Sequence, residues 1–265
     1  MMLTVTARDG TDVRAWEKGR GRPILIVHPG MDDGSSWHAV GEILAERFRV
    51  VIPHRRTYQT DLPGAGMTGE LDHIRALVEE IGEPALLVGH SSGAVVSLEA
   101  LVDMPSAFAG TVLYDPPLVA DGLPFARDPS AIERARAAAA AGKPGKAFAI
   151  FARGVLMLPL PVVWLSAVLA SVMPRVRPLM PSQIEDGAAI EQLGNRLDAY
   201  AGIKVPTILL TGEREQGELH ARLAALAQVM PHAERVAIPK QAHSANRRAP
   251  AEVAKVIAGL ADRIW

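Results

Sequence analysis

The sequence predicts an α/β fold: a mostly parallel, eight-stranded sheet flanked by helices, with an all-helical cap inserted into it. Short apolar runs of strand length alternate with helical patterns along most of the chain, which is typical of a parallel sheet covered on both faces. Between residues 118 and 201 the pattern changes to helical segments without a convincing strand. We therefore expect an α/β core over 1–117 and 202–265 and a helical cap over 118–201.

Eight strands are expected. The first two alternate polar and apolar residues on either side of Asp9 and Gly10, which predicts an antiparallel hairpin. Residues 23–28 form a continuous apolar run, which indicates a central and parallel strand that is buried on both faces. In chain order the predicted strands are 3–7, 13–17, 23–28, 48–53, 85–88, 111–115, 206–211 and 234–239.

Helices are expected between these strands, from apolar residues at helical spacing and from capping residues. Outside the cap they are 36–47, 72–81, 94–102, 217–229 and 251–264. Within the cap they are 130–141, 146–157, 161–173 and 182–200.

The composition excludes several classes of function. The 265 residues are 49% hydrophobic with a net charge of −1, and no basic stripe suggests a nucleic acid partner. The absence of cysteine excludes disulfides, thiolate nucleophiles and Cys-bound metals, and it is compatible with the cytoplasmic location that we expect. We see no secretory signal at the N-terminus, and we expect neither a metal nor a cofactor.

Residues 154–173 form an uncharged run that is long enough to cross a membrane. Pro159 and Pro161 would break a straight helix, and a span there would separate strands that must pair. We therefore expect no transmembrane span and predict a buried or half-buried lid. The alternative is a membrane-docking surface or a surface for a homodimer joined through the cap.

Gly89-His90-Ser91-Ser92-Gly93 follows an apolar strand and opens a helix of small residues. This strand–turn–helix context is the one in which G-x-S-x-G presents a nucleophilic serine. The serine must sit on a strained turn, and the glycines on either side keep the strand and helix from colliding. Ser91 is therefore the predicted nucleophile.

A serine hydroxyl needs a base, usually histidine, and a carboxylate that orients the base. His243 follows the last strand, so it should reach the same edge of the sheet as Ser91. Asp115 and Glu215 each follow a core strand and precede His243, so either could be the acid. Two backbone N–H groups should hold an oxyanion: Ser92, after the nucleophile, and Met31, in the turn where Gly30 allows a close approach.

The chain resembles the α/β-hydrolase fold family over nearly its full length. The residues that carry the resemblance are His28-Pro-Gly-Met31, Trp37, Arg55-Arg56, Gly89-His-Ser-Ser-Gly93, Tyr114-Asp-Pro-Pro117, Gly212-Glu-Arg-Glu215 and Ala242-His243. In most members the acid would be at Glu215 and in a minority at Asp115. Members similar to this chain often read Tyr-Glu-Pro-Pro where this chain has Tyr114-Asp-Pro-Pro117. We therefore prefer Asp115 as the acid and keep Glu215 as the alternative.

Two features depart from the family pattern. Pro29 replaces the usual glycine after His28, and Arg56-Thr-Tyr-Gln-Thr60 replaces an Arg-Gly-x-Gly-x-Ser loop. A larger residue where glycine is usual could reshape the entrance to the pocket.

We expect a serine hydrolase that acts on an apolar ester or lactone through an acyl-enzyme. The alternatives are a general base for C–C cleavage, elimination, cyclisation or rearrangement at the same site, and a ligand-binding protein with vestigial activity. A carboxylate-nucleophile mechanism is disfavoured because the nucleophile position is a serine. The expected partner is a small hydrophobic substrate. The residues expected to line its pocket are His28, Gly30, His90, Met157 and Trp164.

Overall fold

Eight strands form a single sheet in the order β1-β2-β4-β3-β5-β6-β7-β8. The computed structural model describes the whole chain except residues 63, 156–159 and 173–176. The strands are β1 (Met2–Thr6), β2 (Asp12–Lys18), β3 (Pro23–Val27), β4 (Arg49–Pro53), β5 (Ala85–His90), β6 (Phe108–Tyr114), β7 (Thr207–Gly212) and β8 (Glu234–Ile238). Only the β1–β2 and β2–β4 pairs are antiparallel, so the predicted mostly parallel sheet is confirmed.

The buried strands supply both hydrophobic cores, one on each face of the sheet. Successive side chains of a strand point to opposite faces, so Ile24 and Ile26 of β3 join one core, and Leu25 and Val27 join the other. Every residue of β3 and β5 is buried. This double burial explains why the two strands are continuous apolar runs in the sequence.

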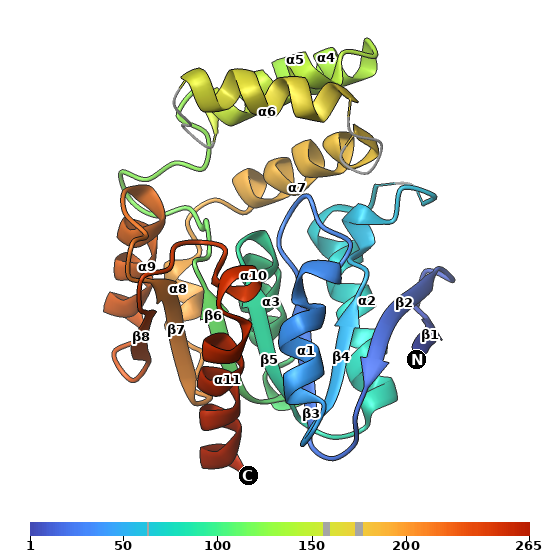
Figure 1. Cartoon of the computed structure of the whole chain (residues 1–265), viewed down its shortest axis with the longest axis vertical. Helices are drawn as coiled ribbons and strands as arrows, with labels where there is room; N and C mark the ends of the chain where they lie inside the picture. The colour runs from blue at the N-terminus through green and yellow to red at the C-terminus, as the bar shows by residue number, and fades with distance from the viewer. Residues whose placement is uncertain (63, 156–159, 173–176) are drawn as a thin grey trace.

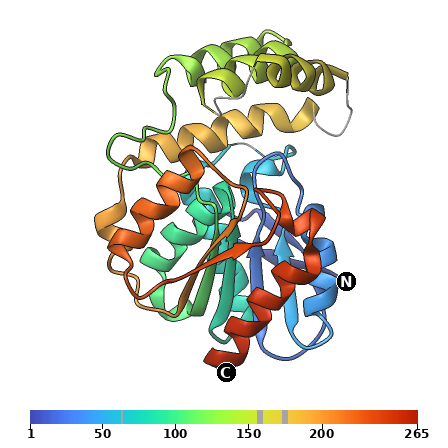
Figure 2. The same cartoon turned by 60° about the vertical axis from the view of Figure 1, so that its left-hand side comes forward.

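Helices cover both faces (Figures 1 and 2). One face carries α1 (His38–Leu44) and α11 (Pro250–Ile264), whose Val253, Ile257 and Leu260 are buried at helical spacing. The other face carries α2 (Gly66–Ile81), α3 (Ser92–Asp103) and α9 (Glu218–Val229). The short helices are η1 (Ser35–Trp37), η2 (Arg56–Tyr58), η3 (Pro105–Ala107), η4 (Arg177–Leu179), α8 (Leu197–Tyr200) and α10 (Ala245–Arg248).

Four helices between β6 and β7 lie beyond one end of the sheet, and α7 is the nearest to it (Figure 1). They are α4 (Ala131–Ala140), α5 (Pro144–Gly154), α6 (Leu160–Val172) and α7 (Met180–Leu193). The single helix expected over 182–200 is wrong, because Gly194 with φ 65° ends α7 and α8 follows separately. The helix expected over 72–81 begins earlier, at Gly66.

In its described part, the uncharged run 154–173 has both buried and exposed apolar side chains. Val155 and Val163 are buried, whereas Leu160 and Trp164 are exposed. Among the helices that the structure describes, none combines the length and the apolar character needed to cross a bilayer.

Candidate active site

Ser91 occupies a sharp turn between β5 and α3. Its φ of 54° and ψ of −126° form a conformation that residues with a side chain rarely adopt. Two backbone hydrogen bonds fix the turn: Ser91 N donates to Tyr114 O, and Ala94 N donates to Ser91 O, each at 2.8 Å. The strained turn that the motif predicts is therefore present.

Gly89 and Gly93 allow this turn to pack closely. A Cβ on Gly89 would lie 2.4 Å from Ser97 Oγ, and one on Gly93 would lie 2.3 Å from the carbonyl oxygen of His28. Real Cβ atoms do not approach other atoms so closely. The start of α3 thus lies directly against the end of β3, where the predicted oxyanion turn begins.

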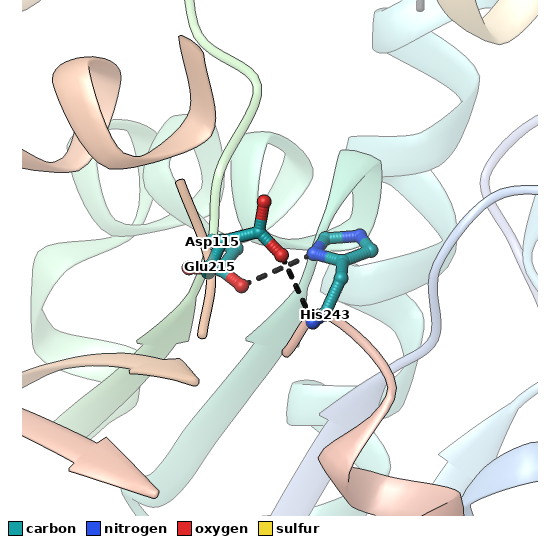
Figure 3. Close-up of side chains that lie close together, drawn as sticks. All are labelled: Asp115, Glu215 and His243. Carbon is teal, nitrogen blue, oxygen red and sulfur yellow. Dashed lines mark hydrogen bonds and ion pairs between the residues drawn. The ribbon is translucent and has the colours of Figure 1, made fainter. Parts of the chain in front are cut away.

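His243 lies in the loop after β8, beside both candidate acids (Figure 3). Its Nδ1 donates to Oδ2 of Asp115 at 3.1 Å, and Asp115 is fully buried. Glu215 accepts instead from the backbone N–H of His243, at 3.0 Å from Oε2. The two acids therefore have different contacts: Asp115 meets the imidazole ring, and Glu215 meets the main chain of the loop.

The electrostatic setting of Glu215 differs from that of an ordinary surface carboxylate. Burial first, and then the neighbouring Asp115, raise the pKa of Glu215 above its ordinary value. One ligand atom each from Asp115, Glu215 and His243 lies within 4.8 Å of the others, so these residues could hold a cation. Their oxygens instead accept hydrogen bonds from His243, which favours an orienting role.

Tyr114 and His90 hold the His243 loop from the sheet side. The Tyr114 hydroxyl donates to Ala242 O at 2.6 Å and accepts from Ala245 N at 3.0 Å, while His90 Nε2 donates to His243 O at 2.9 Å. The His90 ring stacks on Tyr114 with centroids 4.4 Å apart. Burial, and then the proximity of His243, lower the pKa of His90 well below its ordinary value, so the ring is neutral.

The sequence selected His90 as a residue of the pocket, but it did not reveal the role of Tyr114. Tyr114 is the last residue of β6, and its side chain bridges to a loop more than a hundred residues later. Only its place immediately before Asp115 could have drawn attention to it.

The predicted oxyanion turn follows β3. Met31 has φ 54°, and His28 is fully buried, with Nδ1 donating to Pro29 O at 2.8 Å and Nε2 accepting from Arg55 N at 3.1 Å. These two bonds define the tautomer of His28. Burial, and then the nearby Arg55 charge, lower the pKa of His28 to about 3.

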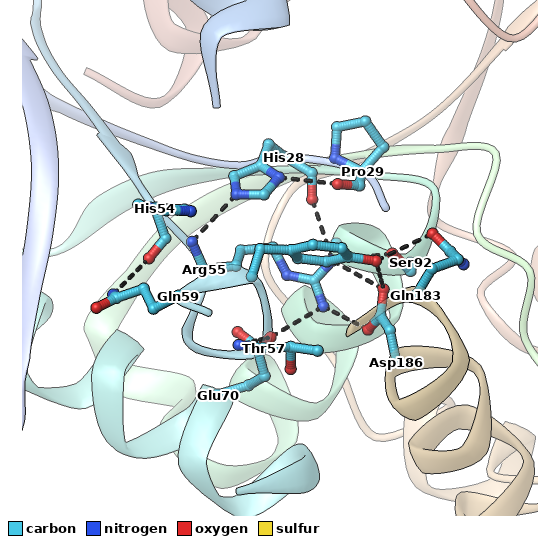
Figure 4. Close-up of polar contacts among 12 residues, drawn as sticks. His28, Pro29, His54, Arg55, Thr57, Gln59, Glu70, Ser92, Gln183 and Asp186 are labelled. Carbon is cyan, nitrogen blue, oxygen red and sulfur yellow. Dashed lines mark hydrogen bonds and ion pairs between the residues drawn. The ribbon is translucent and has the colours of Figure 1, made fainter. Parts of the chain in front are cut away.

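Arg55 contacts both the turn after β3 and the turn of Ser91, and it joins them to α7 (Figure 4). Its side chain is completely buried, and Nη1 donates to Ser92 Oγ at 2.9 Å and to His28 O at 3.4 Å. The same guanidinium forms two hydrogen bonds to Asp186 on α7, at 2.6 and 3.2 Å, and an ion pair with Glu70 at 3.1 Å. Two carboxylates and two neutral oxygens thus surround one buried cation.

Tyr58 and Gln183 complete the contact between α7 and the turn. The Tyr58 hydroxyl donates to Asp186 Oδ2 at 2.9 Å, and it lies 3.0 Å from Gln183 Oε1. A Cβ on Gly30 would lie 2.2 Å from that same oxygen of Gln183 and 2.8 Å from the Tyr58 hydroxyl, so a side chain here would have to displace both groups. Burial first, and then the charge of Asp186, raise the pKa of Tyr58, while the Met31 backbone N–H acts in the opposite sense.

The structure brings together most of the residues that the sequence selected. The turns with Ser91 and Met31, both acids and His243 all follow carboxyl ends of parallel strands, on the side of the sheet facing α7 (Figure 1). No hydrogen bond joins Ser91 to His243 within the described part of the chain, and Trp164 is 70% exposed on α6. Met157 lies outside the described residues, so its place in a pocket stays a prediction.

A model of the alpha/beta hydrolase family matches residues 24–256, from β3 into the last helix. This chain belongs to the alpha/beta hydrolase family. The crystal structure of an alpha/beta hydrolase from Sphaerobacter thermophilus has a TM-score of 0.82 to this chain at 25% identity, covering 97% of this chain and 99% of that one.

Curated relatives match shorter parts of this family member. The pimeloyl-[acyl-carrier protein] methyl ester esterase of Methylococcus capsulatus is 34% identical over 101 residues, covering 36% of this chain and 37% of that protein. The uncharacterized hydrolase YraK of Bacillus subtilis is 28% identical over 116 residues, covering 42% and 43%. Each alignment therefore spans less than half the length of the curated relative.

Proposed function

We propose that this alpha/beta hydrolase cleaves apolar esters or lactones through an acyl-enzyme formed on Ser91. The observation that carries the proposal is the hydrogen bond from His243 Nδ1 to the buried Asp115, at the sheet edge that also carries the strained Ser91 turn. A carboxylate on Nδ1 leaves Nε2 free to take a proton, which is the arrangement that a serine nucleophile needs.

In the proposed mechanism, His243 Nε2 removes the proton of Ser91 as Oγ attacks the substrate carbonyl. The oxyanion receives hydrogen bonds from the N–H groups of Met31 and Ser92, the latter at the free N-terminal end of α3. His243 then protonates the leaving alkoxide. A water molecule, deprotonated by His243, then attacks the acyl carbonyl. The bond from the acyl group to Ser91 Oγ breaks, His243 returns the proton to Oγ, and the carboxylic acid leaves.

Asp115 is the proposed acid, and Glu215 is a positioning residue. The contact of Asp115 with the ring supports its role, because a buried carboxylate on Nδ1 stabilises the imidazolium that forms. The bond from the His243 backbone to Glu215 supports a role in holding the loop.

Two further observations support the choice of substrate class. The Methylococcus relative is named as a methyl ester esterase, although the alignment covers only 37% of that protein. Residues 118–201 are the proposed cap, and their abundance of apolar side chains supports an apolar substrate. A cytoplasmic location and the lack of a cofactor stay predictions from the sequence.

A fluorophosphonate probe tests the nucleophile. We expect one label per chain in the folded protein, no label in Ser91→Ala, and full labelling in Ser106→Ala, which removes an exposed serine of η3. Hydrolysis of p-nitrophenyl esters of increasing acyl length should disappear in Ser91→Ala. Activity that survives Ser91→Ala but is lost in His243→Ala would instead indicate the general-base chemistry.

A further inference from the structure

The helix α6 exposes an apolar face. Of nine large hydrophobic side chains that are exposed in the described part of the chain, five lie on this one helix. They form what we call the α6 face: Leu160, Val162, Trp164, Leu165 and Val168. Apolar exposure concentrated in this way usually marks a surface that binds something.

The α6 face follows the geometry of the helix. Leu160, Trp164 and Val168 recur every four residues and therefore lie on one side, with Leu165 adjoining them. Val163 points the other way and is buried. α5 packs along α6, and both helices lie on the far side of α7 from the sheet (Figures 1 and 2).

The sequence around α6 is strongly basic. Between residues 134 and 184 there is no aspartate or glutamate, whereas the whole chain has a net charge of −1. The basic residues in this interval are Arg134, Arg136, Lys143, Lys146, Arg153, Arg175 and Arg177. The segment that contains the apolar helix therefore carries a local positive charge that the rest of the chain does not share.

Several of these basic side chains are available to a partner. Lys143, Lys146, Arg153 and Arg177 are exposed, and none of them forms an ion pair with the part of the chain that the structure describes. Lys146 and Arg153 are seven residues apart and so share one side of α5, the helix that packs against α6. Arg177 lies in η4, which follows the C-terminal end of α6 in the chain.

We propose that the α6 face and its flanking basic residues dock this protein onto the surface of an anionic lipid bilayer. Apolar side chains enter the boundary between headgroups and acyl chains, while lysine and arginine pair with lipid phosphates. A second copy of the chain fits less well, because a two-fold contact through α6 would bring two basic segments together.

Docking is peripheral. The 13 residues of α6 extend about 20 Å, which is shorter than the roughly 30 Å hydrocarbon layer. The helix can therefore lie in the interface but cannot span it. This proposal concerns where the protein binds and does not depend on the proposed chemistry, so Ser91→Ala should bind vesicles as the wild type does.

Vesicle flotation at low protein concentration tests the proposal. We expect binding to vesicles of phosphatidylcholine mixed with phosphatidylglycerol, weaker binding to phosphatidylcholine alone, and a decrease with added salt. Lys146→Gln with Arg153→Gln should reduce binding to the anionic vesicles about thirtyfold. The matched control, Arg235→Gln with Lys255→Gln, removes two exposed basic residues far from α6 and should change binding little.

Trp164 reports whether the α6 face itself enters the lipid. Brominated lipids should quench the fluorescence of the wild type and of Trp265→Phe, but Trp164→Phe should lose most of that quenching. Equal quenching in all three proteins, or no flotation with anionic vesicles, would overturn the proposal. Light scattering that finds a lipid-independent dimer, lost in Trp164→Ser, would assign the face to a second copy instead.

Discussion

Arg55 and Asp186 form a completely buried ion pair that joins the loop after β4 to α7. Nη1 of the same guanidinium also donates to Ser92 Oγ and approaches His28 O, so one cation touches both sides of the proposed oxyanion hole. The position of α7 is thereby linked to the spacing of the two donor turns. We therefore expect Arg55 to be a positioning residue that acts through its contacts with the Ser92 hydroxyl and the His28 carbonyl.

Asp186→Asn should lower kcat about tenfold and leave KM nearly unchanged. The amide keeps the shape of the side chain but removes its charge, so Arg55 shifts toward Glu70 and its contact with Ser92 loosens. Steady-state kinetics on a p-nitrophenyl ester, below the unfolding temperature of the variant, provides the measurement. Since Ser92→Ala removes the same contact, the two substitutions should be less than additive in kcat.

Glu99→Gln is the matched control for a stability effect. Glu99 is a buried acid on α3 that accepts hydrogen bonds from Arg196 and Tyr200, away from the oxyanion turn. The substitution Glu99→Gln should lower the free energy of unfolding, as Asp186→Asn should, but it should not change kcat. Additive losses in kcat for Ser92→Ala and Asp186→Asn would contradict the positioning role of Arg55.

Asp115→Asn should reduce kcat much more than Glu215→Gln, by about a hundredfold or more. Asparagine can present its N–H to Nδ1 and stabilise the wrong tautomer of His243, whereas the amide introduced by Glu215→Gln still offers an oxygen to the His243 backbone N–H. The two variants are compared by kcat and by the rate of fluorophosphonate labelling. The reverse order of effects would assign the triad acid to Glu215.

Acid should destabilise the protein partly through His28. The folded protein holds the pKa of His28 at about 3, whereas an unfolded histidine has a pKa of about 6.5. Between these values the unfolded chain binds the extra proton, so the free energy of unfolding falls as the pH is lowered. The slope from this one group is at most about 1.4 kcal/mol per pH unit.

The comparison uses urea unfolding of the wild type and His28→Gln across this acidic range. Glutamine offers an amide oxygen in place of the Nε2 acceptor, but it cannot be protonated there. The pKa values of His54, His73 and His90 are also lowered, chiefly by burial, so some pH dependence should remain in the variant. Identical slopes for the two proteins would mean that His28 does not titrate on unfolding.

Local patterns in the sequence predicted the individual strands and the turn of Ser91, because each depends on residues close together in the chain. Apolar periodicity could not predict the contacts of α7, where Asp186 meets an arginine more than a hundred residues earlier. Nor could it distinguish Asp115 from Glu215. Both follow core strands, and only the path of the loop after β8 decides which one meets the ring of His243.

Gly93 lies where the start of α3 packs against the end of β3, at the proposed oxyanion hole. A Cβ there would meet two backbone carbonyl oxygens, of His28 at 2.3 Å and of Val27 at 2.4 Å, and backbone cannot move aside as a flexible side chain can. Gly93→Ala should therefore destabilise the protein by about 1–3 kcal/mol and slow the labelling of Ser91 by displacing the oxyanion turn.

Gly259→Ala is the control, because Gly259 is exposed in α11 and a Cβ there would meet nothing within 4 Å. It should stabilise the protein by about 0.5–1 kcal/mol through helix propensity and leave labelling unchanged. Thermal denaturation and labelling rates are measured on both variants: normal stability and labelling in Gly93→Ala would show that the turn tolerates a side chain.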